Sequence, residues 1–380
     1  MDVDSPHEDS TMTGRREFLG MAAGAVLAAG AGGDREAGRA DRPKTILMLG
    51  GTGFLGPQTV EAALRRGHKV TLFNRGRTRP GLFPDLEKLH GDRDKDDLKA
   101  LEGRRWDAVI DTSANVPRWV KRAAAVLGPN IGHYIYVSSI SVYPDMSKPG
   151  TDETAPVATI DDPTTEKIDG RTYGALKALS EKAAEAAMPG KVAVVRPGLI
   201  VGPEDPSDRF TYWPARVARG GEVLAPGSPD DPIQLIDVRD LGEFLVRLID
   251  DRTTGVFNAL GPDQALTMGR TLEACKQVAR SDATFTWVDA EFLEKQDVHA
   301  WSDMPAWVPN GGETAGFAKV SNARAIKAGL TFRPIDDTAK ATLDWFRSLP
   351  DDRRTELRAG LSHEREAKVL AAWKARAAKP

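Results

Sequence analysis

Residues 45–56 read TILMLGGTGFLG, and no other stretch constrains the fold of this chain as strongly. The apolar run 46–49 predicts a buried parallel strand, and a helical pattern follows over 57–66. The glycines between them allow a tight turn, a close approach of the backbone to a pyrophosphate, and close packing of helix on strand. The free N–H groups of the helix N-terminus favour a phosphate there. We therefore expect a dinucleotide to be held by the backbone of Gly50, Gly51, Thr52, Gly53, Phe54, Leu55 and Gly56.

Composition excludes several classes of function. The 380 residues suffice for a large domain and a smaller one, and the net charge of -3 argues against a surface that binds nucleic acid. The single cysteine, Cys275, excludes an intramolecular disulfide. The sequence contains no CxxC or HExxH motif and no histidine cluster, so we predict no metal site.

Residues 1–40 are expected to lie outside the fold. Arg15 and Arg16 precede a mildly apolar run rich in alanine and glycine over 20–31, which resembles a twin-arginine export signal. The run is too short and too rich in small residues for a stable membrane span. The pattern predicts export to the periplasm. The alternative is a disordered alanine-rich tail on a cytoplasmic protein.

Strands alternate with helices along the next part of the chain. Further strands are expected over 69–73, up to about Gly91, and over 106–111 and 133–138, with a helix over 117–127. This order predicts an α/β fold, a Rossmann doubly wound parallel sheet. We assign 41–200 to this NAD(P)-binding domain. Residues 201–380 are assigned to a smaller α/β substrate lobe, interleaved with the last Rossmann elements and ending in an amphipathic helix.

Polar residues gather where the predicted strands end, which is where ligands bind in such sheets. Asn74 and Arg75 follow the second strand without an acidic residue that would take the ribose hydroxyls. Arg75 favours NADP over NAD, since an arginine accommodates a 2′-phosphate; the alternative is a solvated basic loop. Further cofactor contacts are expected from Asp92, Arg93, Thr112 and Ser113.

Two further stretches indicate a catalytic centre. Ser138 and Ser139 follow the fifth predicted strand, and Tyr173 and Lys177 lie four residues apart, on one face of a helix over 173–187. A neighbouring lysine is expected to lower the pKa of the tyrosine, which could then exchange a proton with a substrate hydroxyl. A serine hydroxyl could hold the same substrate oxygen.

In these motifs the chain resembles the extended short-chain dehydrogenases/reductases, the NAD-dependent epimerase/dehydratase group. The resemblance is strong over about 45–260. It rests on the glycine turn, the 136–143 segment (YVSSISVY), Tyr173 with Lys177, the motif 196–203 (RPGLIVGP) and the motif 236–240 (IDVRD).

The resemblance implies roles for individual residues. Ser139 corresponds to the catalytic serine, with Ser138 as the rival, and Tyr173 and Lys177 to the catalytic tyrosine and lysine. Lys177 would also hold the nicotinamide ribose, and Asp92 with Arg93 would flank the adenine. The same resemblance implies cofactor contacts at Arg196 and Pro197, and a homodimer formed through the helices over 117–127 and 173–187.

The sequence also departs from the family. Leu199 stands where nucleotide-sugar epimerases commonly carry an asparagine that touches the nucleotide, which argues against a UDP-sugar substrate. The pattern is also similar to a divergent branch that includes chloroplast stem-loop RNA-binding proteins. The plant members of that branch lack an intact Tyr-x-x-x-Lys, which this chain keeps.

The smaller lobe supplies candidate substrate contacts. Aromatic and basic residues mix over 208–216, and such residues could grip an anionic or sugar-like ligand; the alternative is aromatic packing with surface arginines. A loop over 301–307 could form a lid on the cleft. The candidate substrate contacts are Arg209, Trp213, Arg216, Gln234 and Arg239.

Three functions remain open from the sequence. The first is an enzyme that epimerises or dehydrates a sugar-like substrate through hydride transfer with bound NAD or NADP. The second is a simple NADP-dependent reductase or dehydrogenase, which needs a cofactor supply and suits the cytoplasm. The third is a non-catalytic RNA-binding or sensor protein of the same fold.

Overall fold

The computed structural model describes residues 42–377, and the expected export signal lies outside the described residues. A seven-stranded sheet has the order β10-β6-β5-β4-β1-β2-β3, and all of its neighbouring strands are parallel. Its strands are β1 (Thr45–Leu49), β2 (Lys69–Asn74), β3 (Glu87–His90), β4 (Trp106–Asp111), β5 (Ile131–Val137), β6 (Val192–Pro197) and β10 (Gly255–Ala259). The predicted doubly wound α/β sheet is confirmed.

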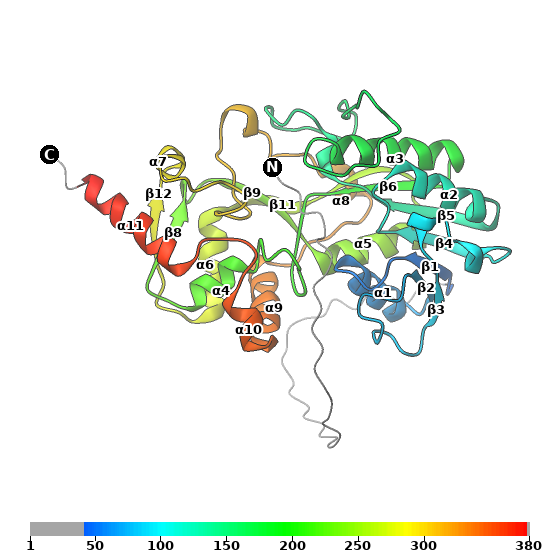
Figure 1. The fold of residues 1–380 in the computed structure, drawn as a ribbon, viewed down its shortest axis with the longest axis horizontal. Coiled ribbons are helices and arrows are strands. Elements are labelled where there is room, and N and C mark those ends of the chain that lie inside the picture. Colours follow the sequence, from blue (N-terminus) through cyan, green and yellow to red (C-terminus); the bar gives the residue numbers. More distant parts are fainter. Residues whose placement is uncertain (1–41, 378–380) are drawn as a thin grey trace, which may run out of the picture.

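Helices cover both faces of this sheet. In Figure 1, α2 (Pro117–Leu127) and α3 (Tyr173–Ala187) lie above it, and α1 (Leu55–Arg65) and α5 (Val238–Asp250) lie below it. Strand residues alternate between the two cores that result. Ile46 and Met48 pack with α1 and α5, whereas Leu47 and Leu49 pack with α2 and α3. The apolar run 46–49 is therefore buried on both sides.

The first helix begins two residues before the predicted start, at Leu55. Pro57 stands in the first turn, where the backbone N–H groups have no partner inside the helix, so the proline costs the helix no hydrogen bond. Between β3 and β4 the chain forms two 3₁₀ turns, Arg93–Lys95 and Lys99–Leu101.

The smaller lobe lies at the left in Figure 1 and holds its own apolar core. Its small sheets are β11-β9-β7, with β7 (Leu199–Val201), β9 (Pro232–Asp237) and β11 (Gly261–Thr267), and the parallel pair β8 (Glu222–Pro226) with β12 (Thr284–Val288). Its helices are α4 (Tyr212–Ala218), α6 (Met268–Ala279), α7 (Ala290–Lys295), α9 (Ile335–Ser348) and α10 (Asp351–Thr355). A short helix, α8 (Ala323–Lys327), packs near β10 of the large sheet.

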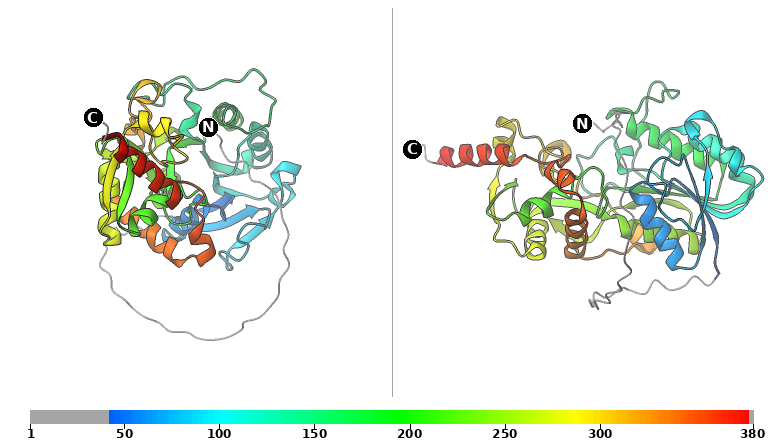
Figure 2. Two further views of the ribbon diagram at one scale, coloured as in Figure 1. Left: turned by 60° about the vertical axis from the view of Figure 1, so that its left-hand side comes forward. Right: turned by 60° about the horizontal axis from the view of Figure 1, so that its bottom comes forward.

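The last helix, α11 (His363–Ala377), packs by its first half on the smaller lobe and projects beyond it (Figure 2). Glu366, Val369 and Leu370 are buried, and Trp373 meets Phe292 of α7 edge to face, with ring centroids 4.9 Å apart. Within the described residues, no helix is long and apolar enough to cross a membrane.

Candidate active site

A cleft of about 2160 Å³ lies between the carboxyl ends of the large sheet and the smaller lobe. Strand-end residues form one wall, and loops of the smaller lobe form the other. Most of the predicted cofactor contacts line it: Gly50, Gly51, Thr52, Gly53, Phe54, Leu55, Gly56, Asn74, Arg75, Asp92, Arg93, Thr112, Ser113 and Pro197. The two residues 74 and 75 sit at the end of β2, with Arg75 exposed to solvent.

The glycine turn is built so that only glycine fits at most of its positions. Gly50 and Gly51 have φ angles of 118° and 88°, which disfavour any side chain. A Cβ on Gly56 would lie 2.5 Å from the backbone of Gly51, so the start of α1 packs directly on the turn. A Cβ on Gly53 would meet nothing within 4 Å, because this residue faces the open cleft.

Tyr173 and Ser139 meet at the far side of the cleft. Tyr173 is the first residue of α3, and Ser139 precedes a 3₁₀ turn over Ile140–Val142. The two elements approach so closely that a Cβ on Gly174 would lie 2.0 Å from the carbonyl oxygen of Ser141. The hydroxyl of Ser139 donates to the hydroxyl of Ser141 at 3.0 Å, and it lies close enough to the phenol of Tyr173 to act on the pKa of that phenol.

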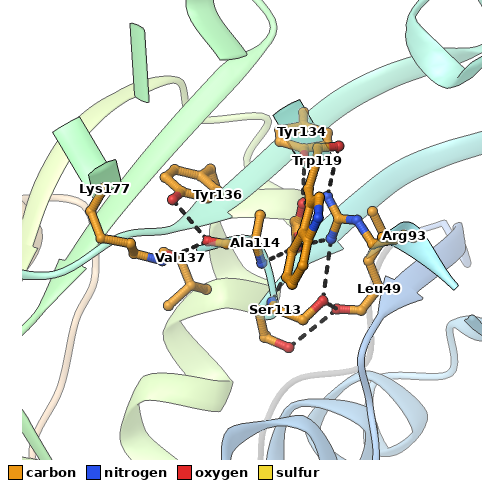
Figure 3. Close-up of polar contacts among 11 residues, drawn as sticks. Leu49, Arg93, Ser113, Ala114, Trp119, Tyr134, Tyr136, Val137 and Lys177 are labelled. Carbon is orange, nitrogen blue, oxygen red and sulfur yellow. Dashed lines mark hydrogen bonds and ion pairs between the residues drawn. The ribbon is translucent and has the colours of Figure 1, made fainter. Parts of the chain in front are cut away.

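Lys177 lies one helical turn further along α3 and is buried, but it still borders the cleft. Its ammonium group donates to the carbonyl oxygens of Val137 at 2.7 Å and Ala114 at 2.9 Å (Figure 3). It also lies 4.7 Å from the ring centroid of Tyr136. Burial lowers the pKa of Lys177 to about 8, and the nearby carboxylate of Asp111 limits the fall.

A buried ion pair fixes the loop that carries the Ala114 carbonyl. The guanidinium of Arg93 binds both carboxylate oxygens of Asp111, at 2.7 and 2.8 Å, and the hydroxyl of Tyr134 donates to the same carboxylate at 2.6 Å. Asp111 in turn accepts from the backbone N–H groups of Ser113 and Ala114. The residues after β4 are thus held in one conformation.

Two expectations concern these groups. Arg93 lines the cleft, and its guanidinium is bound by Asp111 and the carbonyl oxygen of Trp119, so its position beside an adenine stays a prediction. The pKa of Tyr173 is raised by burial, not lowered by Lys177, whose ammonium points to the two carbonyls. The groups that act to lower the pKa of Tyr173 are the hydroxyl of Ser139 and the charge of Arg209.

The structure also distinguishes the two serines and corrects the expectation for Arg196. Ser138 is buried and donates to Glu181 at 2.5 Å, whereas Ser139 faces Tyr173. Arg196 binds the same Glu181 through two contacts of 2.6 and 2.9 Å and donates to the hydroxyl of Tyr143. Arg196 therefore belongs to a buried ion pair behind the cleft and is not among the residues that line it.

Three of the expected substrate contacts are also structural. Trp213 is fully buried and donates from its indole to the carbonyl oxygen of Pro305. Arg216 is 4% exposed and pairs with Glu366 of α11 at 2.5 Å. Arg239 pairs with Asp237, two residues earlier, and lies outside the cleft lining. These three assignments are corrected.

Gln234 and Arg209 do line the cleft. The side-chain amide of Gln234 is bound to the backbone of Val320 through both its oxygen and its nitrogen, at 2.9 and 3.0 Å. Arg209 lies over the ring of Trp301, 5.5 Å from its centroid. Trp301 belongs to the expected lid loop and also lines the cleft.

Sequence reasoning missed several residues of the site. Asp205 is buried in the cleft wall, three residues after Gly202, where the Gly-Pro motif gives a signal for a loop but not for a buried acid. Arg79 donates to the carbonyl oxygens of Thr52 and Gly53 and pairs with Glu204, so it ties the glycine turn to the smaller lobe. Both Arg79 and Glu204 have positive φ angles, and no sequence motif predicts this backbone conformation at either residue.

No group of three or more histidine, cysteine, aspartate or glutamate side chains within residues 42–377 is arranged to hold a metal ion. Cys275, the single cysteine, is buried in α6, where burial raises the pKa of its thiol.

Comparison with known proteins agrees with this architecture. The model of the NAD dependent epimerase/dehydratase family matches residues 46–259. The chloroplast stem-loop binding protein of 41 kDa b from Arabidopsis thaliana is 27% identical over 254 residues, which are 62% of this chain and 63% of that protein. The chain thus spans just under two thirds of the length of that relative.

Two further similarities concern enzymes. The 2-alkyl-3-oxoalkanoate reductase of Stenotrophomonas maltophilia is 28% identical over 249 residues, which cover 58% of this chain and 67% of the reductase. The solved structure of the Thermus thermophilus UDP-glucose 4-epimerase, in complex with NAD, superposes with a TM-score of 0.57 at 17% identity, over 80% of this chain and all of the other. The last similarity shows the fold alone. The family match, which spans more than half of the chain, shows that this protein belongs to the NAD dependent epimerase/dehydratase family, enzymes of the extended short-chain dehydrogenase/reductase type.

Proposed function

We propose that the protein holds NAD or NADP in this cleft and epimerises or dehydrates a sugar-like substrate at a hydroxyl or ketone group, with Tyr173 as the acid/base. One observation carries the proposal: Ser139, Tyr173 and Lys177 line the same cleft as the glycine turn. A dinucleotide seated on the turn would extend along the strand ends towards Tyr173.

The residues present fit such a cofactor. The glycine turn leaves open space over Gly53, and the first backbone N–H groups of α1 have no partner inside the helix. A nicotinamide dinucleotide supplies the acceptance and return of a hydride. Thr112 and Ser113, whose hydroxyls are bonded to the carbonyl oxygen of Leu49, would border the cofactor at the end of β4.

Each catalytic side chain has a separate task in this proposal. The Tyr173 phenol exchanges a proton with the substrate oxygen, and the hydroxyl of Ser139 holds that oxygen. Burial keeps the phenol protonated when no charge approaches, because it raises the pKa of Tyr173. Lys177 has two of its three N–H donors on carbonyl oxygens, and the third remains for a ribose hydroxyl.

The cofactor choice and the location are also proposals. Arg75 lies exposed at the cleft, which supports NADP, whereas the family description supports NAD. Arg15 and Arg16 support export through the twin-arginine pathway to the periplasm. Free NADPH is not regenerated there, so a protein exported with its cofactor would best run a redox-neutral cycle, in which the same substrate is oxidised and then reduced.

A simple reductase is the second candidate, and the similarity to the 3-oxo acid reductase of Stenotrophomonas maltophilia favours it. The similarity to the chloroplast stem-loop binding protein supports a third, non-catalytic function, but the net charge of -3 and the Ser139, Tyr173 and Lys177 set count against it. We also propose a homodimer through α2 and α3, which pack beside each other on one face of the large sheet.

The Tyr173→Phe variant tests the enzymatic proposal. It removes the phenolic proton but keeps the ring, so dinucleotide binding should be retained while conversion of the substrate to its epimer or dehydrated product, followed by NMR, falls by about 10²-fold or more. Unchanged turnover in Tyr173→Phe would contradict the assignment. Net consumption of NADPH by the wild-type protein would favour the reductase over the internal cycle.

A further inference from the structure

The wall of the cleft opposite the glycine turn carries a second set of polar groups. After β7 the chain runs through residues 202–210, and Asp205, Ser207 and Arg209 of this segment line the cleft. The loop over 299–302 faces them with Trp301, whose ring meets Phe317 edge to face at 5.3 Å between centroids. None of these residues belongs to the Ser139, Tyr173 and Lys177 set.

The guanidinium of Arg209 is oriented by two neighbouring side chains and is not directly paired with a carboxylate among the described residues. It lies over the Trp301 ring, and its Nε donates to the hydroxyl of Ser207 at 3.0 Å. Within residues 42–377 it forms no ion pair, and its two terminal nitrogens have no hydrogen-bonding partner. The two terminal nitrogens of a guanidinium can donate two parallel N–H bonds to the two oxygens of a carboxylate. A guanidinium that is held on an aromatic ring is already oriented for this contact.

Asp205 supplies the second observation. Its side chain is 2% exposed, and its Oδ1 accepts from the backbone N–H and the hydroxyl of Ser207, at 2.9 and 2.7 Å. Its Oδ2 has no partner among the described residues. A buried oxygen without a partner is costly, and a ligand hydroxyl at this point of the cleft would satisfy it.

The segment that carries both residues is rigid. Asp208, which is fully buried and has a φ angle of 57°, binds Arg353 of α10 with both oxygens at 2.7 Å. The backbone N–H of Arg358 donates to the same carboxylate at 3.0 Å. The C-terminal part of the chain therefore fixes the position of Arg209 before any ligand arrives, which lowers the entropy cost of binding.

We propose that this wall is a carboxylate subsite, in which Arg209 binds the carboxylate of the substrate and Asp205 bonds a neighbouring hydroxyl. The inference rests on the proposed function and narrows its substrate to a hydroxy or oxo acid, such as a sugar acid, instead of a neutral sugar. Arg209 lines the same cleft as Tyr173, and its charge acts to lower the pKa of that phenol. Leu199, which lines the cleft without a polar side chain, offers no contact to a nucleotide base.

Matched pairs of acids and their methyl esters test the subsite. We would measure binding of D-glucuronate and 3-oxooctanoate, and of the methyl ester of each, to the dinucleotide-loaded protein by calorimetry. At least one acid should bind about 10- to 100-fold more tightly than its ester, since the ester lacks the charge that a guanidinium recognises. An equal affinity within both pairs, including no detectable binding of either acid, would overturn the inference.

Variants separate recognition from folding. The Arg209→Gln variant should bind each acid no more tightly than its methyl ester, whereas Arg209→Lys should keep part of the preference for the acid. The Asp205→Asn variant should lower the affinity for an acid and for its ester by the same factor. Asp205→Asn keeps the oxygen that accepts from Ser207, so its thermal unfolding should match that of the wild type. The control is Arg219→Gln, an exposed arginine outside the cleft lining, which should change neither affinity nor preference.

The same experiment separates a failure of the proposed function from a failure of the carboxylate subsite. Dinucleotide binding is measured first in each variant, because Arg209 and Asp205 do not contact the glycine turn. A protein that binds no dinucleotide contradicts the proposed function. A protein that binds it, and whose acid preference survives in Arg209→Gln, contradicts only the carboxylate subsite.

Discussion

Lys177 and Ala114 are joined by a hydrogen bond of 2.9 Å, from the ammonium group to the backbone carbonyl oxygen. The same carbonyl accepts from the hydroxyl of Tyr136 at 3.0 Å, and the N–H of Ala114 donates to Asp111 at 3.1 Å. Because Asp111 is held by Arg93, the buried ion pair determines where the carbonyl stands (Figure 3). Arg93 thus acts on Lys177 through two intermediate groups, Asp111 and the backbone of Ala114.

The Asp111→Asn variant tests this chain of contacts. It should lower the free energy of unfolding by about 3–5 kcal/mol, because it leaves the Arg93 guanidinium buried without its counter-charge. Urea unfolding followed by circular dichroism measures the loss. Asp344→Asn removes an exposed pair with Lys340 and should cost no more than about 0.5 kcal/mol. Similar losses in the two variants would contradict the role of the buried pair.

The affinity for dinucleotide should depend on the protonation of Lys177. Its pKa of about 8 means that the free protein loses this proton as the pH rises through that value. The neutral amine keeps only two N–H donors, which the two carbonyls occupy, so none remains for the ribose. NADH and NADPH affinities measured by fluorescence from pH 6 to 10 should therefore weaken above pH about 8.

Substitution at the lysine provides the control for this pH dependence. The Lys177→Met variant should bind NADH and NADPH more weakly than the wild type at pH 7. Its affinity for them should not change between pH 7 and 9. Lys182→Met, an exposed lysine on the same helix, should keep the wild-type profile. A profile that persists in Lys177→Met would assign the titration to another group.

Two glycines of the turn should respond differently to the same substitution. Gly56→Ala forces a Cβ against the backbone of Gly51 and should destabilise the fold by about 1–3 kcal/mol. Gly53→Ala meets nothing within 4 Å and should change stability by less than about 1 kcal/mol, but its methyl group enters the cleft. Thermal unfolding and dinucleotide titration measure both effects. Full dinucleotide affinity in Gly53→Ala would contradict the proposed position of the cofactor.

Arg75 should set the preference between the two dinucleotides. The Arg75→Ala variant is expected to bind NADPH about 10-fold or more weakly than the wild type. Its affinity for NADH should be almost unchanged, because only NADPH carries the 2′-phosphate. Calorimetric titration of both cofactors gives the ratio. An equal loss of affinity for NADH and NADPH would show that Arg75 does not recognise the 2′-phosphate.

The alternation of strands and helices, the burial of β1 on both faces and the placement of Tyr173 and Lys177 on one helix follow from local patterns. Apolar runs, glycine positions and the spacing of Tyr173 and Lys177 each act within a few residues, so the sequence alone indicates them. The resemblance to a known family added the choice of Ser139, which the buried contact of Ser138 with Glu181 supports.

Several basic side chains that looked free in the sequence are bound by acidic partners in the fold. Arg196 pairs with Glu181, Arg93 with Asp111, and Arg216 with Glu366, which lies 150 residues away. A cation near a cleft motif looks available in the sequence until the fold brings it a partner, and no local pattern records that partner. Asp205 shows the converse, because its unpartnered oxygen becomes visible only once its burial is known.

The central claim is that the cleft holds a nicotinamide dinucleotide, and mass spectrometry of the small molecules released on denaturation tests it most directly. The purified protein should release NAD or NADP in a near-equimolar amount, and tight retention would support an internal redox cycle. A protein that releases neither dinucleotide, but binds added NADPH, would favour the reductase. A protein that releases none and binds none on titration would contradict the account, including the role of the glycine turn.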